Sequence, residues 1–225
     1  MAAIEDVRDV LFSILALNYS GLNFYLFHVS LFLFCLNIAI HRRTENALKQ
    51  LVYTYGGSTL AGALIGVTPF IFTNKLAIPT HILARLVVFL APRELFQTFL
   101  VDWTLRVGME LCRCMIATTW LNHTERVFGK QTGLEGVLIG TVAGTFGAVL
   151  GSLSLRPIFS TTFLGLLFAM LAYQFAFERN SPEEENLARS FVVVWMVVIQ
   201  HIIPRLLSSV RRAFGSRASV KTKVE

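Results

Sequence analysis

Two glycine-bounded stretches organise this sequence: Gly-Ala-Leu-Ile-Gly at positions 62–66 and Gly-Ala-Val-Leu-Gly at positions 147–151. Both lie within long apolar runs, and the second follows the first by 85 positions. Glycines four positions apart share one face of a helix and allow another backbone to approach closely. Two such helices at a fixed offset predict a duplicated membrane unit, which is typical of transporters and channels. Chance recurrence is the alternative, because glycine is frequent in membrane helices.

The composition is that of a polytopic membrane protein. Of the 225 residues, 54% are hydrophobic and 19 are Phe. The net charge of +6 comes from basic residues that flank apolar runs. We therefore expect contact with anionic membrane lipids and no nucleic-acid partner. The three cysteines lie in apolar stretches, where we expect free thiols.

Seven apolar stretches are long enough to cross a membrane, which takes about 20 helical residues. A bend is expected at Pro92 in the third of them. The predicted spans are 23–40, 47–69, 82–100, 103–121, 133–153, 158–177 and 190–207.

These spans predict an all-α membrane fold. An odd number of spans in each repeat inverts the second repeat relative to the first. We expect two inverted three-helix repeats, at about 21–101 and 102–178, followed by a seventh helix at 190–207. An amphipathic segment at 1–20 precedes the channel-like domain 21–209, and a basic tail at 210–225 follows it.

Lys and Arg divide 11 to 6 between the two predicted sides of the membrane, which places the N-terminus in the lumen and the C-terminus in the cytosol. Glycosylation sequons at Asn18 and Asn122 fall on the lumenal side, although each lies close to the membrane boundary. Lys221 and Lys223 resemble a dilysine retrieval signal of the endoplasmic reticulum. A generic lipid-binding basic tail is the alternative.

Three charged residues lie inside the fourth span. Arg106, Glu110 and Arg113 are spaced i, i+4, i+7 and so share one helical face. Because an ionisable group facing lipid is costly, this face is expected to point into the bundle or a water-filled cavity. It predicts either a site for an ion or lipid headgroup, with a gating role, or a structural ion pair. Arg85 is expected near the lumenal end of the third span, where its side chain can reach the interface.

The second and fifth spans are unusually rich in glycine. Helix kinks at glycines free carbonyl oxygens, and carbonyl and hydroxyl oxygens can replace the water shell of a monovalent cation. Close helix packing without conduction is the alternative. The predicted pore-lining residues are Gly56, Gly57, Ser58, Gly62, Gly66, Gly140, Gly144, Gly147 and Gly151.

The sequence contains no recognisable catalytic set. His-Glu-x-x-His, Cys-x-x-Cys, Gly-x-Ser-x-Gly and P-loop motifs are all missing, and the five histidines are scattered. We therefore expect no enzymatic activity and no metal site.

Three motifs over about 47–124 resemble the trimeric intracellular cation channel family. Gly56-Gly57 precedes the first glycine-bounded stretch, as in the family's second helix. The stretch 92–96, Pro-Arg-Glu-Leu-Phe, is similar to the family's Pro-x-acidic-Leu-Phe. The stretch 109–113, Met-Glu-Leu-Cys-Arg, lies where the family has Lys-Glu-x-x-Arg, with Met109 in place of the lysine.

The resemblance implies a homotrimer in which each subunit has its own pore between the second and fifth helices. It also implies potassium-selective conduction across the endoplasmic or sarcoplasmic reticulum membrane, as counter-ion flow during calcium release. A phosphoinositide bound by the fourth helix is implied as well, with Glu110 and Arg113 in that site and Arg106 as a substitute for the missing lysine. A secondary transporter, or a non-conducting structural protein of the same fold, is the alternative function.

Overall fold

The computed structural model describes residues 22–129, 133–177, 179 and 181–209. Four predictions fall outside these residues: the amphipathic segment at 1–20, the basic tail at 210–225, the sequon at Asn18 and the paired lysines near the end. Every regular element in the described ranges is a helix, and no strand occurs there. The all-α prediction is therefore confirmed for this part of the chain.

The first half of the described chain consists of helices of very different lengths and ends with one of 30 residues. Asn46 caps α3 by accepting a hydrogen bond from the Lys49 amide at 2.8 Å. The same helix ends at Gly66, whose φ of +71° is the left-handed conformation that glycine adopts without strain. The elements are α2 (Leu22–His41), α3 (Ala47–Ile65), α4 (Phe70–Thr73), α5 (Ala77–Leu90), α6 (Arg93–Gln97) and α7 (Phe99–Phe128).

The second half is also built from capped helices. Ser160 caps α9, and Ser181 forms a reciprocal capping box with Glu184 at the start of α10. A single π-helical turn interrupts the last helix, which then continues to Ser209. The elements are α8 (Gly133–Ser152), the 3₁₀ turn η1 (Arg156–Phe159), α9 (Thr161–Phe175), α10 (Pro182–Val197) and the π-helical turn η2 (Val198–Ile202).

Each predicted span overlaps one long helix, but the bounds of the third span, 82–100, are wrong. The helix α5 begins earlier, at Ala77, and already ends at Leu90. Ala91 is extended, with φ −81° and ψ 143°, because a following proline disfavours helical backbone. The expected bend at Pro92 is thus a complete break, after which α6 leads into α7.

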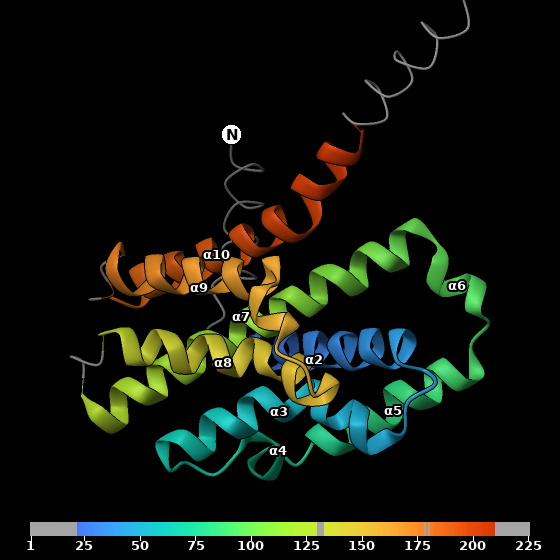
Figure 1. The fold of residues 1–225 in the computed structure, drawn as a ribbon, viewed down its shortest axis with the longest axis horizontal. Coiled ribbons are helices and arrows are strands. Elements are labelled where there is room, and N and C mark those ends of the chain that lie inside the picture. Colours follow the sequence, from blue (N-terminus) through green and yellow to red (C-terminus); the bar gives the residue numbers. More distant parts are fainter. Residues whose placement is uncertain (1–21, 130–132, 178, 180, 210–225) are drawn as a thin grey trace, which may run out of the picture.

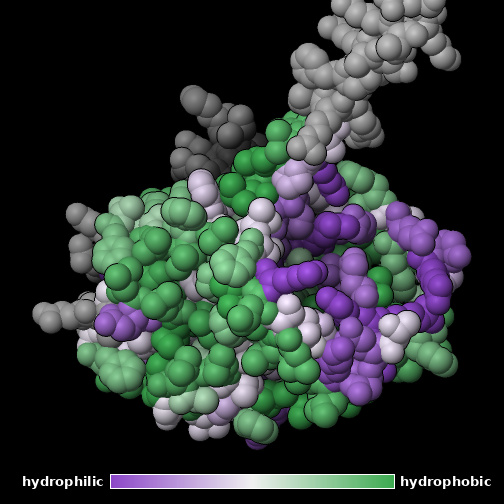
Figure 2. Space-filling view, viewed as in Figure 1, coloured by the Kyte–Doolittle hydropathy of each residue, from purple (hydrophilic) through white to green (hydrophobic). Residues whose placement is uncertain are grey.

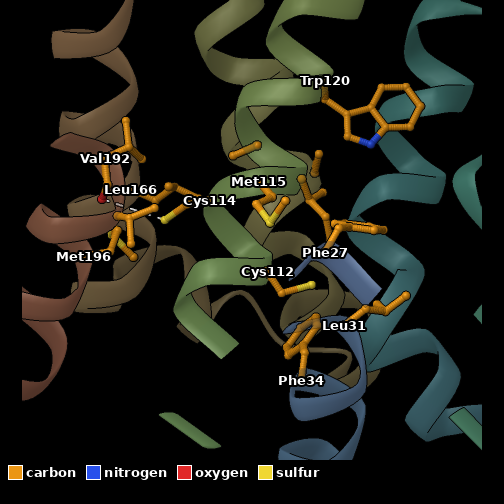
Figure 3. Packing of buried hydrophobic residues seen from close by; sticks show 14 of the residues in the cluster. Phe27, Leu31, Phe34, Cys112, Cys114, Met115, Trp120, Leu166, Val192 and Met196 are labelled. Carbon is orange, nitrogen blue, oxygen red and sulfur yellow. Dashed lines mark hydrogen bonds between the residues drawn. The ribbon is translucent and has the colours of Figure 1, made fainter. Parts of the chain in front are cut away.

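The long helix α7 runs through the middle of the bundle (Figure 1). It packs against α2, α8 and α10. The most extensive contact between any two helices is that of α3 with α8. Figure 3 shows that α7 contributes Cys112, Cys114 and Met115 to the core between α2 on one side and α9 and α10 on the other. The Cys114 thiol donates to the Val192 carbonyl at 3.8 Å. All three cysteines of the chain are buried and free, as expected.

Two segments of the fold have the same order of elements. In each, a glycine-rich helix is followed by a one-turn helix and then a shorter apolar helix: α3, α4, α5 and then α8, η1, α9. Ala47 and Gly133, which start the first helices, are 86 positions apart, and so are Phe70 and Arg156, which start the one-turn helices. This order agrees with a duplication, while the inverted arrangement and the number of membrane crossings stay predictions.

Large apolar side chains cover much of the outer surface. Phe89, Phe99, Phe159 and Leu153 are between 72% and 91% exposed. Figure 2 shows a broad apolar face, with hydrophilic residues gathered on the side where Figure 1 places α6 and the start of α7. Two helical stretches, Gly133–Ser152 and Leu187–Ser209, have the length and hydropathy needed to cross a membrane. A soluble monomer seldom exposes an apolar surface of this extent.

Candidate functional site

The helices α3 and α8 touch through their backbones at a glycine interface, formed by Gly56 and Gly57 of α3 and Gly147 and Gly151 of α8. A Cβ atom on Gly57 would lie 2.6 Å from the Ala143 carbonyl oxygen. A Cβ atom on Gly147 would collide with the Tyr53 carbonyl. Because Tyr53 meets Gly147 whereas Gly57 meets Ala143, the two helices run antiparallel. At Gly57 and Gly147 neither helix can gain a side-chain atom unless the backbones separate, whereas Gly56 and Gly151 have side chains as their nearest neighbours.

The other predicted pore glycines face different neighbours. Gly62 packs on the Val67 carbonyl and on Trp120 of α7. Gly140 lies against the Ala117 carbonyl of α7 and Met170 of α9. The predicted set therefore does not form one continuous surface: only the four residues of the glycine interface meet between α3 and α8.

Three further members of the predicted set have local contacts. Gly144 lies beside Arg113 and Leu166, with a Cβ position 2.7 Å from a Leu166 methyl carbon. Gly66 is the C-cap of α3 and has no atom within 4 Å of its Cβ position. Ser58 is buried, and its hydroxyl donates to the Tyr55 carbonyl of its own helix at 2.9 Å.

The charged column of α7 consists of Asp102, Arg106, Glu110 and Arg113, and its inner end is deeply buried. Both Glu110 carboxylate oxygens accept hydrogen bonds from Arg113 Nη1, at 2.6 and 2.7 Å, and Glu110 is 1% exposed. Arg113 Nε also donates to the Gly144 carbonyl at 3.1 Å, which ties α7 to α8. This arrangement favours the structural alternative for the pair, because Arg113 already has its charge neutralised inside the protein.

A histidine from the last helix reaches the same carboxylate. His201 Nε2 lies 3.6 Å from Glu110 Oε1, and His201 is itself buried. His201 belongs to η2, and a π-helical turn changes the direction of the side chains that follow it. Side chains of α7 and the last helix, with a carbonyl of α8, thus meet around Glu110. An isolated histidine in an apolar run predicts a polar contact between helices, but the sequence gives no sign that the partner of His201 is Glu110.

The outer end of the charged column is more exposed. Arg106 Nε donates to both Asp102 oxygens, at 2.8 and 2.9 Å, and the Arg106 side chain is 39% exposed. Arg205 lies 3.7 Å from Asp102 and stacks over the Trp103 ring at 4.7 Å. Asp102 could have been found from its i, i+4 spacing to Arg106. The predicted face is therefore two sites: a buried pair, and a half-exposed arginine one to two turns away.

Arg85 lies in the second half of α5, whereas the predicted span places it near the start. It borders a small cavity with Arg43 and Gln50, which belong to the α2–α3 connection and the first turn of α3. The expected position of Arg85 near the start of its span is wrong, while the side of the membrane on which it lies stays a prediction. The error follows from the span bounds, because α5 begins at Ala77 and Arg85 lies in its second half.

A polar network closes the far end of α7. Asn122 Nδ2 donates to Glu185 of α10 at 2.7 Å, and its Oδ1 accepts from Tyr173 of α9 at 3.4 Å. Arg179 pairs with Glu125 at 2.7 Å. Partial burial by itself lowers the pKa of Arg179, but its hydrogen bonds to Glu125 raise the pKa overall. The side chain of the Asn122 sequon is thus held within the fold.

Comparisons with known proteins agree with this architecture. No family model and no curated protein matches the chain. A solved structure of a trimeric intracellular cation channel from C. elegans with bound Ca²⁺ is similar, with a TM-score of 0.61 at 16% identity over 88% of this chain and 98% of that one. A structure of such a channel without Ca²⁺ gives 0.60 at 17% identity, over 85% and 96%. This chain therefore has the fold of trimeric intracellular cation channels, which the resemblance of its motifs predicted.

Proposed function

We propose that this chain is a homotrimeric monovalent cation channel, selective for potassium, in the endoplasmic or sarcoplasmic reticulum membrane. It would supply counter-ion flow during calcium release. The observation that carries the proposal is the fold similarity, which extends over 88% of this chain and 98% of a trimeric intracellular cation channel. The sequence motifs around Gly56-Gly57, Pro92 and Glu110 support the same assignment independently.

A membrane location is supported by the outer surface. The exposed apolar side chains occur on α5, α7, α8, α9 and the last helix, so a lipid environment would cover several sides of the bundle. The charges of Glu110 and Arg113, whose side chains are 1% and 12% exposed, are paired inside it. Pairing of this kind is what an apolar environment requires of buried charge.

The proposed pathway follows α3 and α8, with α7 beside them. In the structure the two backbones are in contact at Gly57 and Gly147, so we assign the structure to a closed state in which these helices must separate before ions pass. Monovalent selectivity is supported by charge: α3 contains no carboxylate, and Glu135 in the first turn is the only one in α8. Without an acidic ring, the sequence offers no evident source of divalent selectivity.

The experiment is a planar-bilayer recording of the purified chain under a potassium gradient. Discrete openings that reverse near the potassium equilibrium potential would support the proposal. Saturable flux without unitary currents would favour a secondary transporter. Well-folded protein that gives neither unitary currents in the bilayer nor saturable flux in a transport assay would favour the structural alternative.

A matched pair of variants tests the pathway. Gly147→Ala adds a methyl group where α8 touches α3, whereas Ala148→Leu adds atoms one position later, on an exposed side of the same helix. In protein that remains folded, we expect the first substitution to change open probability and the second to leave it unchanged. Equal effects would argue against a pathway between α3 and α8.

A further inference from the structure

A cavity of about 800 Å³ lies away from the glycine interface, none of whose residues borders it. It lies at the ends of α2 and α5 and the start of α7, with α6 on its rim. A smaller cavity of about 130 Å³ adjoins it, because Arg43 and Val88 border both. We call the two together the basic cavity, after its arginines Arg43, Arg85, Arg93 and Arg106.

Within the described ranges, few negative charges balance the positive charge of the basic cavity. Asp102 is the one carboxylate among the residues that border it, and Asp102 already pairs with Arg106 and Arg205. The side chains of Arg43, Arg85 and Arg93 make no ion pair or hydrogen bond with any part of the chain that the structure describes. Exposed Arg43 and Arg93 thus border the larger part, and Arg43 and partly buried Arg85 the smaller part, without a described carboxylate partner, a setting that attracts an anion.

Arg85 supplies an independent sign of a missing ligand. Its Nη1 atom is fully buried and has no hydrogen-bond partner among the described residues. Gln50 borders the smaller part of the cavity together with Arg85, but its unpartnered Oε1 atom is an acceptor that a phosphate oxygen cannot satisfy, so the Arg85 donor alone indicates an anion. A buried guanidinium donor without an acceptor is costly, so an oxygen atom from outside the protein is expected beside it.

The same cavity has an apolar wall. Ile40, Val88, Phe96 and Leu105 border it together with the arginines. Figure 2 shows the hydrophilic side of the molecule meeting the apolar face directly. A ligand with a phosphate at one end and a hydrocarbon chain at the other would satisfy both parts of the lining.

We propose that the basic cavity binds an anionic phospholipid, with its phosphate oxygens accepting hydrogen bonds from Arg43, Arg93 and Arg85. The site shares only Arg106 with the one that the family resemblance implies: Glu110 and Arg113 do not border it, and Arg113 is already neutralised by Glu110. The proposal depends on the membrane location but not on conduction.

The test measures equilibrium binding of fluorescent phosphatidic acid to the full-length protein in neutral detergent. We expect Arg43→Gln with Arg93→Gln to weaken binding about tenfold or more, since each substitution removes a charge-assisted hydrogen bond. The matched control is Arg42→Gln: Arg42 is adjacent in sequence but pairs with Glu45 and does not border the cavity. Equal weakening by the control, or none by the double variant, would overturn the proposal.

Competition separates a lipid from a soluble anion. We expect unlabelled phosphatidic acid to displace the probe, while phosphatidylcholine and inorganic phosphate do so at least tenfold more weakly. Displacement by inorganic phosphate at the same concentration would assign the site to a soluble phosphate and overturn the lipid. Displacement by phosphatidylcholine at the same concentration would show that the arginines do not select charge, which also overturns it.

A thermal-shift measurement on Arg85→Met tests the unpartnered donor. Lipid-free variant protein should unfold at the same temperature as the unsubstituted chain or higher, because a buried unsatisfied group has been removed. Added phosphatidic acid should then raise the unfolding temperature less than it does in the unsubstituted chain. A lower unfolding temperature without lipid, and an unchanged rise with it, would show that Arg85 supports the fold and does not bind lipid. Bilayer currents are measured separately, so failure here leaves the channel proposal standing.

Discussion

The glycine interface and the charged column of α7 tolerate opposite kinds of substitution. At the glycine interface, backbone meets backbone, so the contact fails when atoms are added. In the charged column, Glu110 and Arg113 neutralise each other in a buried site, so the contact fails when atoms are removed. The two regions meet where Arg113 donates to the Gly144 carbonyl. The difference shows that a glycine limits the size of its replacement, whereas a buried charge limits the charge of its replacement.

The largest effect is expected where one charge is left alone. Glu110→Gln removes the carboxylate but keeps the shape of the side chain, so Arg113 remains buried without a counter-charge. Loss of one partner from a buried pair costs about 3–5 kcal/mol. The fraction of protein that stays folded after heating in detergent measures it.

A paired replacement provides the control for this prediction. Glu110→Leu combined with Arg113→Met removes both charges at once and should recover part of the loss, since buried pairs can be replaced by apolar groups at little cost. If Glu110→Gln alone unfolds like the unsubstituted chain, Glu110 is not charged in the folded state and the comparison fails.

A smaller effect is expected from growth at the glycine interface. Gly147→Ala places a methyl group against the Tyr53 carbonyl, and overpacking of this kind costs about 1–3 kcal/mol. Ala148→Leu should leave the unfolding temperature within error. If the two variants are equally stable, the backbones are farther apart in solution than in the structure.

The last glycines of the two glycine-bounded stretches, Gly66 and Gly151, are expected to respond differently to substitution. Gly66→Ala has open space around it but must adopt a φ of +71°, which costs about 1–2 kcal/mol for a residue with a side chain. Gly66→Asn should recover much of this, because Asn tolerates the left-handed conformation. Gly151 instead packs on the Tyr53 ring, so Gly151→Asn should be no more stable than Gly151→Ala. If Asn were better than Ala by the same amount at both positions, the two glycines would not have different roles.

The smallest effect is expected at the outer end of the charged column. Arg106→Gln breaks a pair with Asp102 in which both side chains are at least 30% exposed. Exposed pairs contribute about 0–1 kcal/mol, and Arg205 remains to accompany Asp102. A loss as large as that of Glu110→Gln would mean that the column acts as one unit, which chemical or thermal unfolding of the two variants compares directly.

Sequence reasoning found the helices well and their contacts less well. Apolar length predicted where α2, α3, α8 and α9 lie, because burial and lipid exposure both select for continuous apolar residues. It failed around Pro92, because the apolar residues continue past this proline whereas the hydrogen-bonded helix ends at Leu90. That one error also misplaced Arg85.

The candidate site was predictable in kind but not in arrangement. Helical spacing placed Arg106, Glu110 and Arg113 on one face, and they do lie along α7. Spacing within one helix cannot reveal that His201 approaches from another, or that Gly66 ends a helix while Gly151 packs inside one. These facts depend on the crossing of distant segments, which sequence separation does not record.

The burial of every cysteine gives the chain a practical property. Cys35, Cys112 and Cys114 are all 0% exposed, so a membrane-impermeant thiol reagent should find almost nothing to modify in the folded protein. A single cysteine introduced at an exposed site, such as Arg93, would then be labelled alone. The sidedness of each loop can therefore be mapped by labelling intact and opened microsomes, without first removing the natural thiols.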